Sequence, residues 1–77
     1  MNRLKQYKDI TRQQFLNKIK TFRIKLAGCY DVVLIEDSDA ELVPYEDMAK
    51  TLIDIESYAY EHNNDKRVEL MEIFNAN

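Results

Sequence analysis

The pattern of apolar and polar positions predicts two amphipathic helices, and the first begins at Thr11. Thr11 and Gln14 have the spacing of a capping box, which satisfies backbone donors at the start of a helix. The apolar stripe that follows has spacings of four, three and four residues and consists of Phe15, Ile19, Phe22 and Leu26. Gly28 suits the left-handed residue that ends many helices, so this helix ends near Ala27.

The end of this first helix has a second interpretation, because apolar and charged residues alternate there. Phe22, Ile24 and Leu26 are separated by Arg23 and Lys25, as in a strand with one buried face. Ile24 also lies off the apolar stripe of the helix. We favour the helix, but periodicity alone leaves residues 21–27 open between helix and strand.

The second amphipathic pattern predicts a long helix from Pro44 to about His62. Acidic residues occupy its first turn, where the helix dipole favours negative charge. Its apolar positions fall within one arc and are Tyr45, Met48, Ala49, Leu52, Ile53, Ile55, Ala59 and Tyr60. Glu56 projects from the middle of this arc and therefore needs a partner, for which a basic side chain of the first helix is a candidate.

The segment between these helices predicts a small β-hairpin. Residues 30–35 are rich in β-branched side chains and apolar on both faces, as in a buried strand. Residues 36–39 supply turn formers, and residues 41–43 return as a short strand that ends at the proline. Asp65 is expected to cap a last short helix. The expected fold is α+β and helix-dominated, in the order α-β-β-α-α, with an all-α fold as the alternative.

Composition indicates one small domain, residues 1–77, with an apolar fraction of 45%. Because so small a core supplies limited stability, we expect a homodimer. The candidate self-association surface on the last helix is Leu70, Met71, Ile73 and Phe74. With a single cysteine, no signal peptide and no apolar stretch long enough for a membrane span, we expect a cytoplasmic protein without membrane contact.

The net charge of −3 conceals a strong segregation of charge along the chain. Residues 1–28 carry eight basic side chains and one acidic one, whereas residues 29–77 carry three basic and thirteen acidic side chains. The two halves can neutralise one another within the fold, or each can face a partner.

Each charged half supplies one candidate binding surface, with an ordinary solvated helix face as the alternative for both. The acidic candidate would bind a protein partner and consists of Glu36, Asp37, Asp39, Glu41, Asp47, Asp54 and Glu61. The basic candidate would bind nucleic acid and consists of Arg12, Lys18, Lys20, Arg23 and Lys25.

The sequence offers few residues for catalysis, since it contains one cysteine and one histidine. Cys29 precedes a predicted strand and is expected to be a small buried residue. His62 is expected to stabilise the end of a helix as a cation. Residues 37–48 begin like a calcium-binding loop, but Leu42 stands where that loop requires glycine. We therefore expect no enzyme activity, no cofactor and no metal.

The segment of residues 30–48 begins with Tyr30-Asp31-Val32-Val33 and continues to Val43-Pro44-Tyr45-Glu46-Asp47-Met48. These motifs resemble a hairpin-then-helix pattern in small accessory proteins encoded by bacteriophages and mobile elements. That pattern has glycine in the turn where this sequence has Asp39-Ala40, and it brings no assigned active residues. The resemblance implies a compact protein that acts in the host cytoplasm by binding a host or self protein.

The lack of recognisable catalytic or metal-binding motifs and the segregation of charge along the chain together predict a non-enzymatic protein-interaction or inhibitory module. In this hypothesis the acidic hairpin and long helix face a partner protein. The alternative is a small nucleic-acid-binding regulator that uses the basic first helix.

Overall fold

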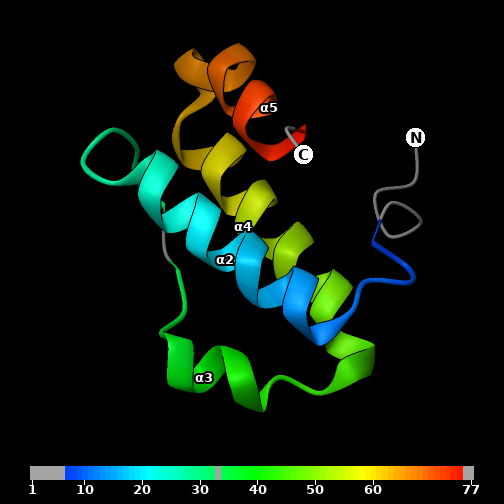
Figure 1. Cartoon of the computed structure of the whole chain (residues 1–77). Coiled ribbons are helices and arrows are strands. Elements are labelled where there is room, and N and C mark those ends of the chain that lie inside the picture. Colours follow the sequence, from blue (N-terminus) through cyan, green and yellow to red (C-terminus); the bar gives the residue numbers. More distant parts are fainter. Residues whose placement is uncertain (1–6, 33, 76–77) are drawn as a thin grey trace.

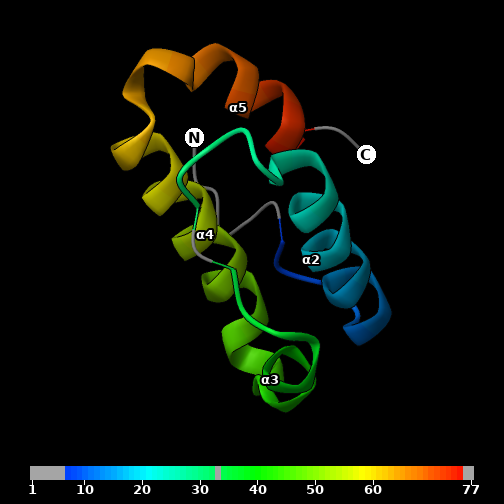
Figure 2. The same ribbon diagram turned by 90° about the vertical axis from the view of Figure 1, so that its left-hand side faces the viewer.

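A computed structural model describes residues 7–32 and 34–75 of the chain, and this part is helical throughout its regular structure. Two long helices, α2 and α4, lie side by side, while α5 closes one end of the pair and α3 the other (Figures 1 and 2). The elements are α2 (Arg12–Leu26), α3 (Asp37–Leu42), the 3₁₀ turn η1 (Tyr45–Asp47), α4 (Met48–His62), the 3₁₀ turn η2 (Asn64–Lys66) and α5 (Arg67–Asn75).

The predicted β-hairpin is absent from the described residues, so the α+β expectation is wrong and the all-α alternative fits. Residues 37–42 form α3, because Asp37 and Asp39 occupy its first turn, where negative charge favours a helix. The predicted first strand therefore has no strand to pair with. Val33, within that prediction, lies outside the described residues. The resemblance to phage accessory proteins rested on this hairpin, which the described residues do not form.

Side chains take the place of a partner strand along the segment before α3. The Asn63 amide donates to the Asp31 carbonyl at 2.8 Å, and its oxygen accepts from the Asp31 N–H at 3.0 Å. The same amide also donates to the Ala59 carbonyl at 3.1 Å. Asn63 thus satisfies both backbone groups of Asp31, as a neighbouring strand would in a ladder.

The structure confirms the helix predicted from Thr11, including the segment that could have been a strand. The Thr11 hydroxyl accepts from the Gln14 N–H at 3.1 Å, and the Gln14 side chain accepts from the Thr11 N–H at 2.9 Å. Ala27 is the C-cap, and Gly28 follows with φ of 72°, the left-handed conformation that glycine adopts without strain.

The ends of the later helices agree only in part with the prediction. The predicted long helix opens with the 3₁₀ turn η1 and continues as α4 to His62, as expected. Asp65 does not cap α5, since it lies within η2, and α5 begins at Arg67. The Lys66 N–H donates to the Asn63 carbonyl at 2.9 Å, so the chain tightens into this 3₁₀ turn before the α-helix starts.

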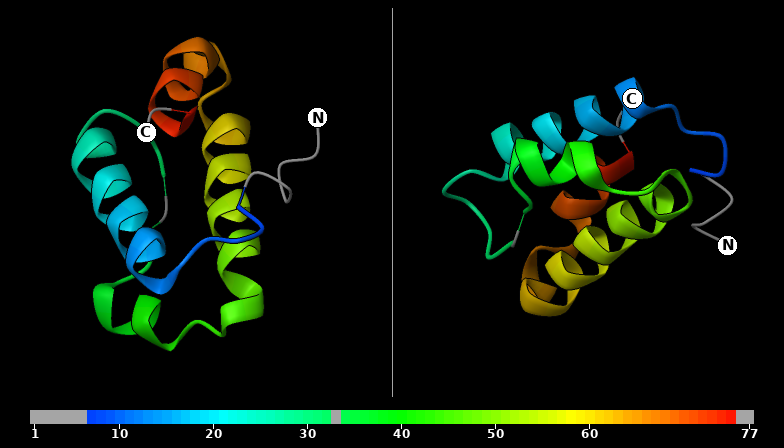
Figure 3. Two further views of the ribbon diagram at one scale, coloured as in Figure 1. Left: turned by 45° about the vertical axis from the view of Figure 1, so that its right-hand side comes forward. Right: turned by 90° about the horizontal axis from the view of Figure 1, so that it is seen from below.

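The core lies between α2 and α4 and is closed by α5, as the left view of Figure 3 shows. Phe22 meets Phe74 edge to face with ring centroids 4.9 Å apart. The buried Glu56 accepts a hydrogen bond at 2.7 Å from the hydroxyl of Tyr7, which precedes α2. The buried apolar residues are Tyr7, Phe15, Ile19, Phe22, Leu26, Ala40, Met48, Leu52, Ile55, Ala59, Leu70 and Phe74.

Candidate functional site

The two residues considered for catalysis lie on the surface. Cys29 is exposed, so the expectation of a buried cysteine is wrong; it lies in the turn after α2, beside Gly28. His62 lies in the last turn of α4, as expected, with its Nδ1 3.0 Å from the Tyr58 carbonyl and its ring stacked on Tyr58 at 3.9 Å. Within residues 7–32 and 34–75, no three His, Cys, Asp or Glu side chains are grouped so that they could hold a metal ion.

A shallow groove of about 320 Å³ lies between α4 and α5. It is lined by Ile53, Glu56, Ser57, Tyr60, Arg67, Met71 and Asn75. The Arg67 guanidinium lies over the Tyr60 ring, 4.8 Å from its centroid. The described lining contains no histidine, cysteine or lysine, and its one carboxylate, Glu56, is buried and accepts a hydrogen bond from the Tyr7 hydroxyl. The helices of the described part are too short or too polar to cross a membrane.

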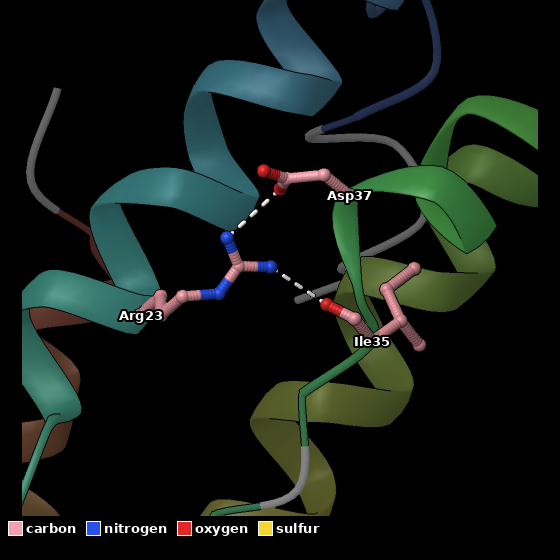
Figure 4. A network of polar contacts seen from close by, with 3 residues as sticks. All are labelled: Arg23, Ile35 and Asp37. Carbon is pink, nitrogen blue, oxygen red and sulfur yellow. Dashed lines mark hydrogen bonds and ion pairs between the residues drawn. The ribbon is translucent and has the colours of Figure 1, made fainter.

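Arg23, from the predicted basic surface, is engaged within the fold (Figure 4). Its guanidinium donates to Asp37 Oδ1 at 2.8 Å and to the Ile35 carbonyl at 2.7 Å. This hydrogen bond and the guanidinium charge lower the pKa of Asp37 below its ordinary value. Arg23 therefore fixes the start of α3 against α2.

Arg12 holds the other end of α3. Its guanidinium donates to the Ala40 carbonyl at 3.0 Å and to the Val43 carbonyl. Both carbonyls lie at the C-terminal end of α3, where a helix leaves acceptors unsatisfied and favours a positive charge. Two of the five residues of the basic candidate surface thus hold α3 in place.

The three lysines of that basic surface are in unequal surroundings. Lys18 is half-buried, with its Nζ 5.8 Å from the centroid of the Phe22 ring, and burial lowers its pKa. Lys20 and Lys25 are exposed. The structure therefore does not present the five basic side chains as one solvated stripe.

All seven residues of the acidic candidate surface are exposed, but they are not all gathered in one place. Asp37 pairs with Arg23, and Asp54 accepts from Lys50 at 2.9 Å, which raises the pKa of Lys50. Because a helix rises about 1.5 Å per residue, Asp54 and Glu61 lie roughly 10 and 20 Å along α4 from its start. These two residues are separated from the acids around α3.

The remaining acids concentrate in residues 36–47, which we call the acidic end. This segment spans α3 and η1 and contains no basic residue. Its acidic residues are Glu36, Asp37, Asp39, Glu41, Glu46 and Asp47. Among the described residues only Asp37 of this set makes an ion pair. Glu46 was absent from the predicted surface, although its neighbours in the sequence could have indicated it.

Two large apolar residues of the acidic end point into solvent, which the sequence reasoning missed. Leu42 is 79% exposed and Tyr45 is 61% exposed. The predictions that Leu42 lies in a strand and that Tyr45 belongs to the apolar arc of the long helix are wrong, since Leu42 ends α3 and Tyr45 lies exposed in η1. Tyr45 lies in η1, before the α-helical turn of α4 begins, so the helical arc does not apply to it.

The candidate self-association surface on α5 divides between core and surface. Leu70 and Phe74 are fully buried within the chain's own core, whereas Met71 is 48% exposed and Ile73 is partly buried. Val68, which was not among the candidates, is exposed next to them in the sequence. A second copy of the chain therefore cannot contact Leu70 or Phe74 unless the core opens.

Comparison with known proteins identifies no relative of this chain, so a function can be argued only from the structure described above. No family model matches the sequence, and neither a curated protein nor a solved structure shows significant similarity to it.

Proposed function

We propose that this chain is a non-enzymatic interaction module that binds a partner protein through its acidic end. The observation that carries the proposal is the charge of residues 36–47, where six exposed acidic residues and no basic residue lie between α2 and α4 in the sequence. Of these acids only Asp37 makes an ion pair within the described part. Such a surface attracts a positively charged protein surface and repels other anions.

The contacts that the basic residues of α2 make within the fold support a protein partner over the nucleic-acid alternative. A protein that binds a duplex neutralises several phosphates with free lysines and arginines. Here Arg12 and Arg23 are hydrogen-bonded to α3 and to the residues that flank it. Placing Arg23 on a phosphate would also bring Asp37, which lies 2.8 Å from the Arg23 guanidinium, close to that phosphate.

An inhibitory role follows from the same chemistry. A partner whose basic surface is covered by the acidic end cannot use that surface to hold another anionic ligand. Charged residues at the rim of an interface act mainly on association rate, so this binding should weaken as salt screens the charges.

The proposal is tested by affinity capture from a cell lysate, divided into nuclease-treated and untreated arms. Wild type is compared with Asp39→Lys/Glu41→Lys in the acidic end and with the matched control Lys20→Glu/Lys25→Glu on α2. We expect proteins captured by wild type to survive nuclease treatment, and the acidic-end variant to lose them by roughly tenfold or more at low salt. The α2 variant should retain them.

The opposite pattern would favour the nucleic-acid regulator. Capture that disappears after nuclease treatment, or that the Lys20→Glu/Lys25→Glu variant loses while the acidic-end variant keeps it, contradicts the proposal. Circular dichroism on each variant checks that the helices are retained.

Self-association is a separate part of the proposal and uses a smaller surface than the sequence indicated. Val68, Met71 and Ile73 remain available on α5, while Leu70 and Phe74 are occupied in the core. Stable dimers bury about 800 Å² per partner, which three side chains alone do not provide. We therefore propose a weak, concentration-dependent homodimer.

A further inference from the structure

Leu42 and Tyr45 stand on either side of the junction between α3 and η1. Leu42 is the last residue of α3 and Tyr45 is the first residue of η1, and each exposes more than half of its surface. Large apolar side chains with this exposure contribute little to the stability of their own fold, because they remain in water. Tyrosine is a frequent anchor in protein interfaces, and an exposed leucine beside it adds apolar area that a partner can bury.

The backbone between the two side chains is held by hydrogen bonds and by the packing of Val43 against the core. Val43 is partly buried against the core; its N–H donates to the Ala40 carbonyl at 3.3 Å and its carbonyl accepts from Arg12. The Pro44 carbonyl accepts from the Asp47 N–H at 2.9 Å. Leu42 and Tyr45 are therefore presented by a fixed junction, which lowers the entropic cost of binding them.

Acids flank this apolar pair on both sides along the chain. Glu41 precedes Leu42, and Glu46 and Asp47 follow Tyr45; all three are exposed. A ligand that binds at this junction meets apolar side chains and negative charge within a few residues of one another, so apolar contact combined with positive charge would match both.

Charge argues against two other occupants of this surface. A second copy related by a two-fold axis would place one acidic end against the other. An anionic lipid surface would be repelled in the same way. The surface instead fits a protein segment in which an apolar stripe is bordered by lysine or arginine, as in a basic amphipathic helix.

We propose, resting on the function proposed above, that Leu42 and Tyr45 are the anchors of the acidic end and that its partner presents a basic amphipathic helix. The acids orient the partner, and the two apolar side chains pack against its apolar stripe. Removing an anchor should then speed dissociation, whereas reversing an acid should mainly slow association.

The test uses two synthetic peptides of equal length and equal charge. One has leucines at helical spacing among lysines, and the other has serines in place of the leucines. Binding of each labelled peptide to the full chain is followed by fluorescence anisotropy. The protein variants are Leu42→Ser, Tyr45→Ser and the control Ile24→Ser, which alters a residue 74% exposed on α2, outside the acidic end.

We expect the leucine-containing peptide to bind wild type about tenfold or more tightly than the serine peptide. Leu42→Ser and Tyr45→Ser should each remove most of this difference, and Ile24→Ser should leave it unchanged. If the leucine peptide binds all four proteins equally and Asp39→Lys/Glu41→Lys weakens it, the anchors are wrong while the acidic end stands. If Asp39→Lys/Glu41→Lys also binds both peptides as tightly as wild type does, then both the anchors and the proposed function are wrong.

Discussion

Arg12 and Arg23 show how single side chains hold a short helix in place in this protein. Each guanidinium carries five donors in a planar fork and can satisfy acceptors at two positions of the chain. Arg12 does this for the Ala40 and Val43 carbonyls, and Arg23 for Ile35 and Asp37. A lysine, with one compact ammonium group, would not bridge these pairs equally well.

At the same scale, Tyr30 links the segment after α2 to α5. Its hydroxyl donates to Glu69 Oε2 at 2.7 Å, and Lys66 Nζ lies 5.2 Å from the centroid of its ring. The hydrogen bond to Glu69, together with burial and the nearby negative charge, raises the pKa of Tyr30 to about 12.

This raised pKa predicts a stability change at alkaline pH. Below the ordinary tyrosine pKa of about 10, both folded and unfolded chains keep the proton and the contact contributes fully. As pH rises from about 10 to 12, the unfolded chain loses the proton first, so the contribution of Tyr30 is lost. Titration of the ring signals of Tyr30 by NMR should show a pKa near 12, and Glu69→Ala should return this pKa toward 10.

The control for this titration is Glu61→Ala, which removes an exposed acid of α4 that makes no ion pair in the described part. A Tyr30 signal that titrates near 10 in wild type, or that moves equally in both variants, contradicts the assigned cause.

At the scale of elements, α3 is a helix that is stabilised mainly by its contacts with α2 and the core. A helix of six residues is far shorter than an isolated helix needs to be in water. Ala40 inserts into the core with no exposed surface, and the two arginines of α2 hold the ends of the helix. Its stability therefore depends on tertiary contacts more than on its own sequence.

Replacing Arg12 by Gln should release the C-terminal end of α3 without unfolding the protein. Two charge-assisted hydrogen bonds to carbonyls are lost, and each such bond contributes up to about 3 kcal/mol to the free energy of folding. Hydrogen exchange of the amides in residues 40–43 should accelerate by tenfold or more, while those of α4 keep their protection.

Lys20→Gln is the matched control, since it removes a positive charge from the exposed side of the same helix. Equal acceleration in both variants would mean that general charge, not the Arg12 contacts, holds α3.

At the scale of the whole molecule, α5 closes the end of the α2 and α4 pair and divides its apolar residues between two uses (Figure 2). Leu70 and Phe74 complete the core with Phe22, while Met71 and Val68 face solvent. Only the packing of three helices around one core separates these neighbouring residues into core and surface.

Leu70→Ala and Met71→Glu should therefore behave differently. The first leaves a cavity in the core and should lower the free energy of unfolding in urea by about 2 to 5 kcal/mol. The second should change it by about 0.5 kcal/mol or less, yet weaken the proposed homodimer in sedimentation equilibrium. Loss of stability in Met71→Glu without a change in self-association would contradict this division of α5.

Local signals in the sequence predicted the two long helices, although they left residues 21–27 open between helix and strand and did not show that the second helix opens with a 3₁₀ turn. The capping box at Thr11, the closing Gly28 and the apolar stripes of α2 and α4 depend on residues within a few positions of one another. The acidic character of residues 36–47 was equally legible, because charge does not depend on the fold.

Tertiary structure decided the conformation of residues 41–43 and the burial of individual apolar side chains, which local signals in the sequence do not determine. Residues 41–43 were predicted as a strand, but Glu41 and Leu42 end α3, where Arg12, which is distant in sequence, donates to the Ala40 and Val43 carbonyls. Whether Leu42, Tyr45, Leu70 and Met71 are buried depends on which helices lie against them. Burial results from contacts between distant segments, and a pattern within one segment cannot specify those contacts.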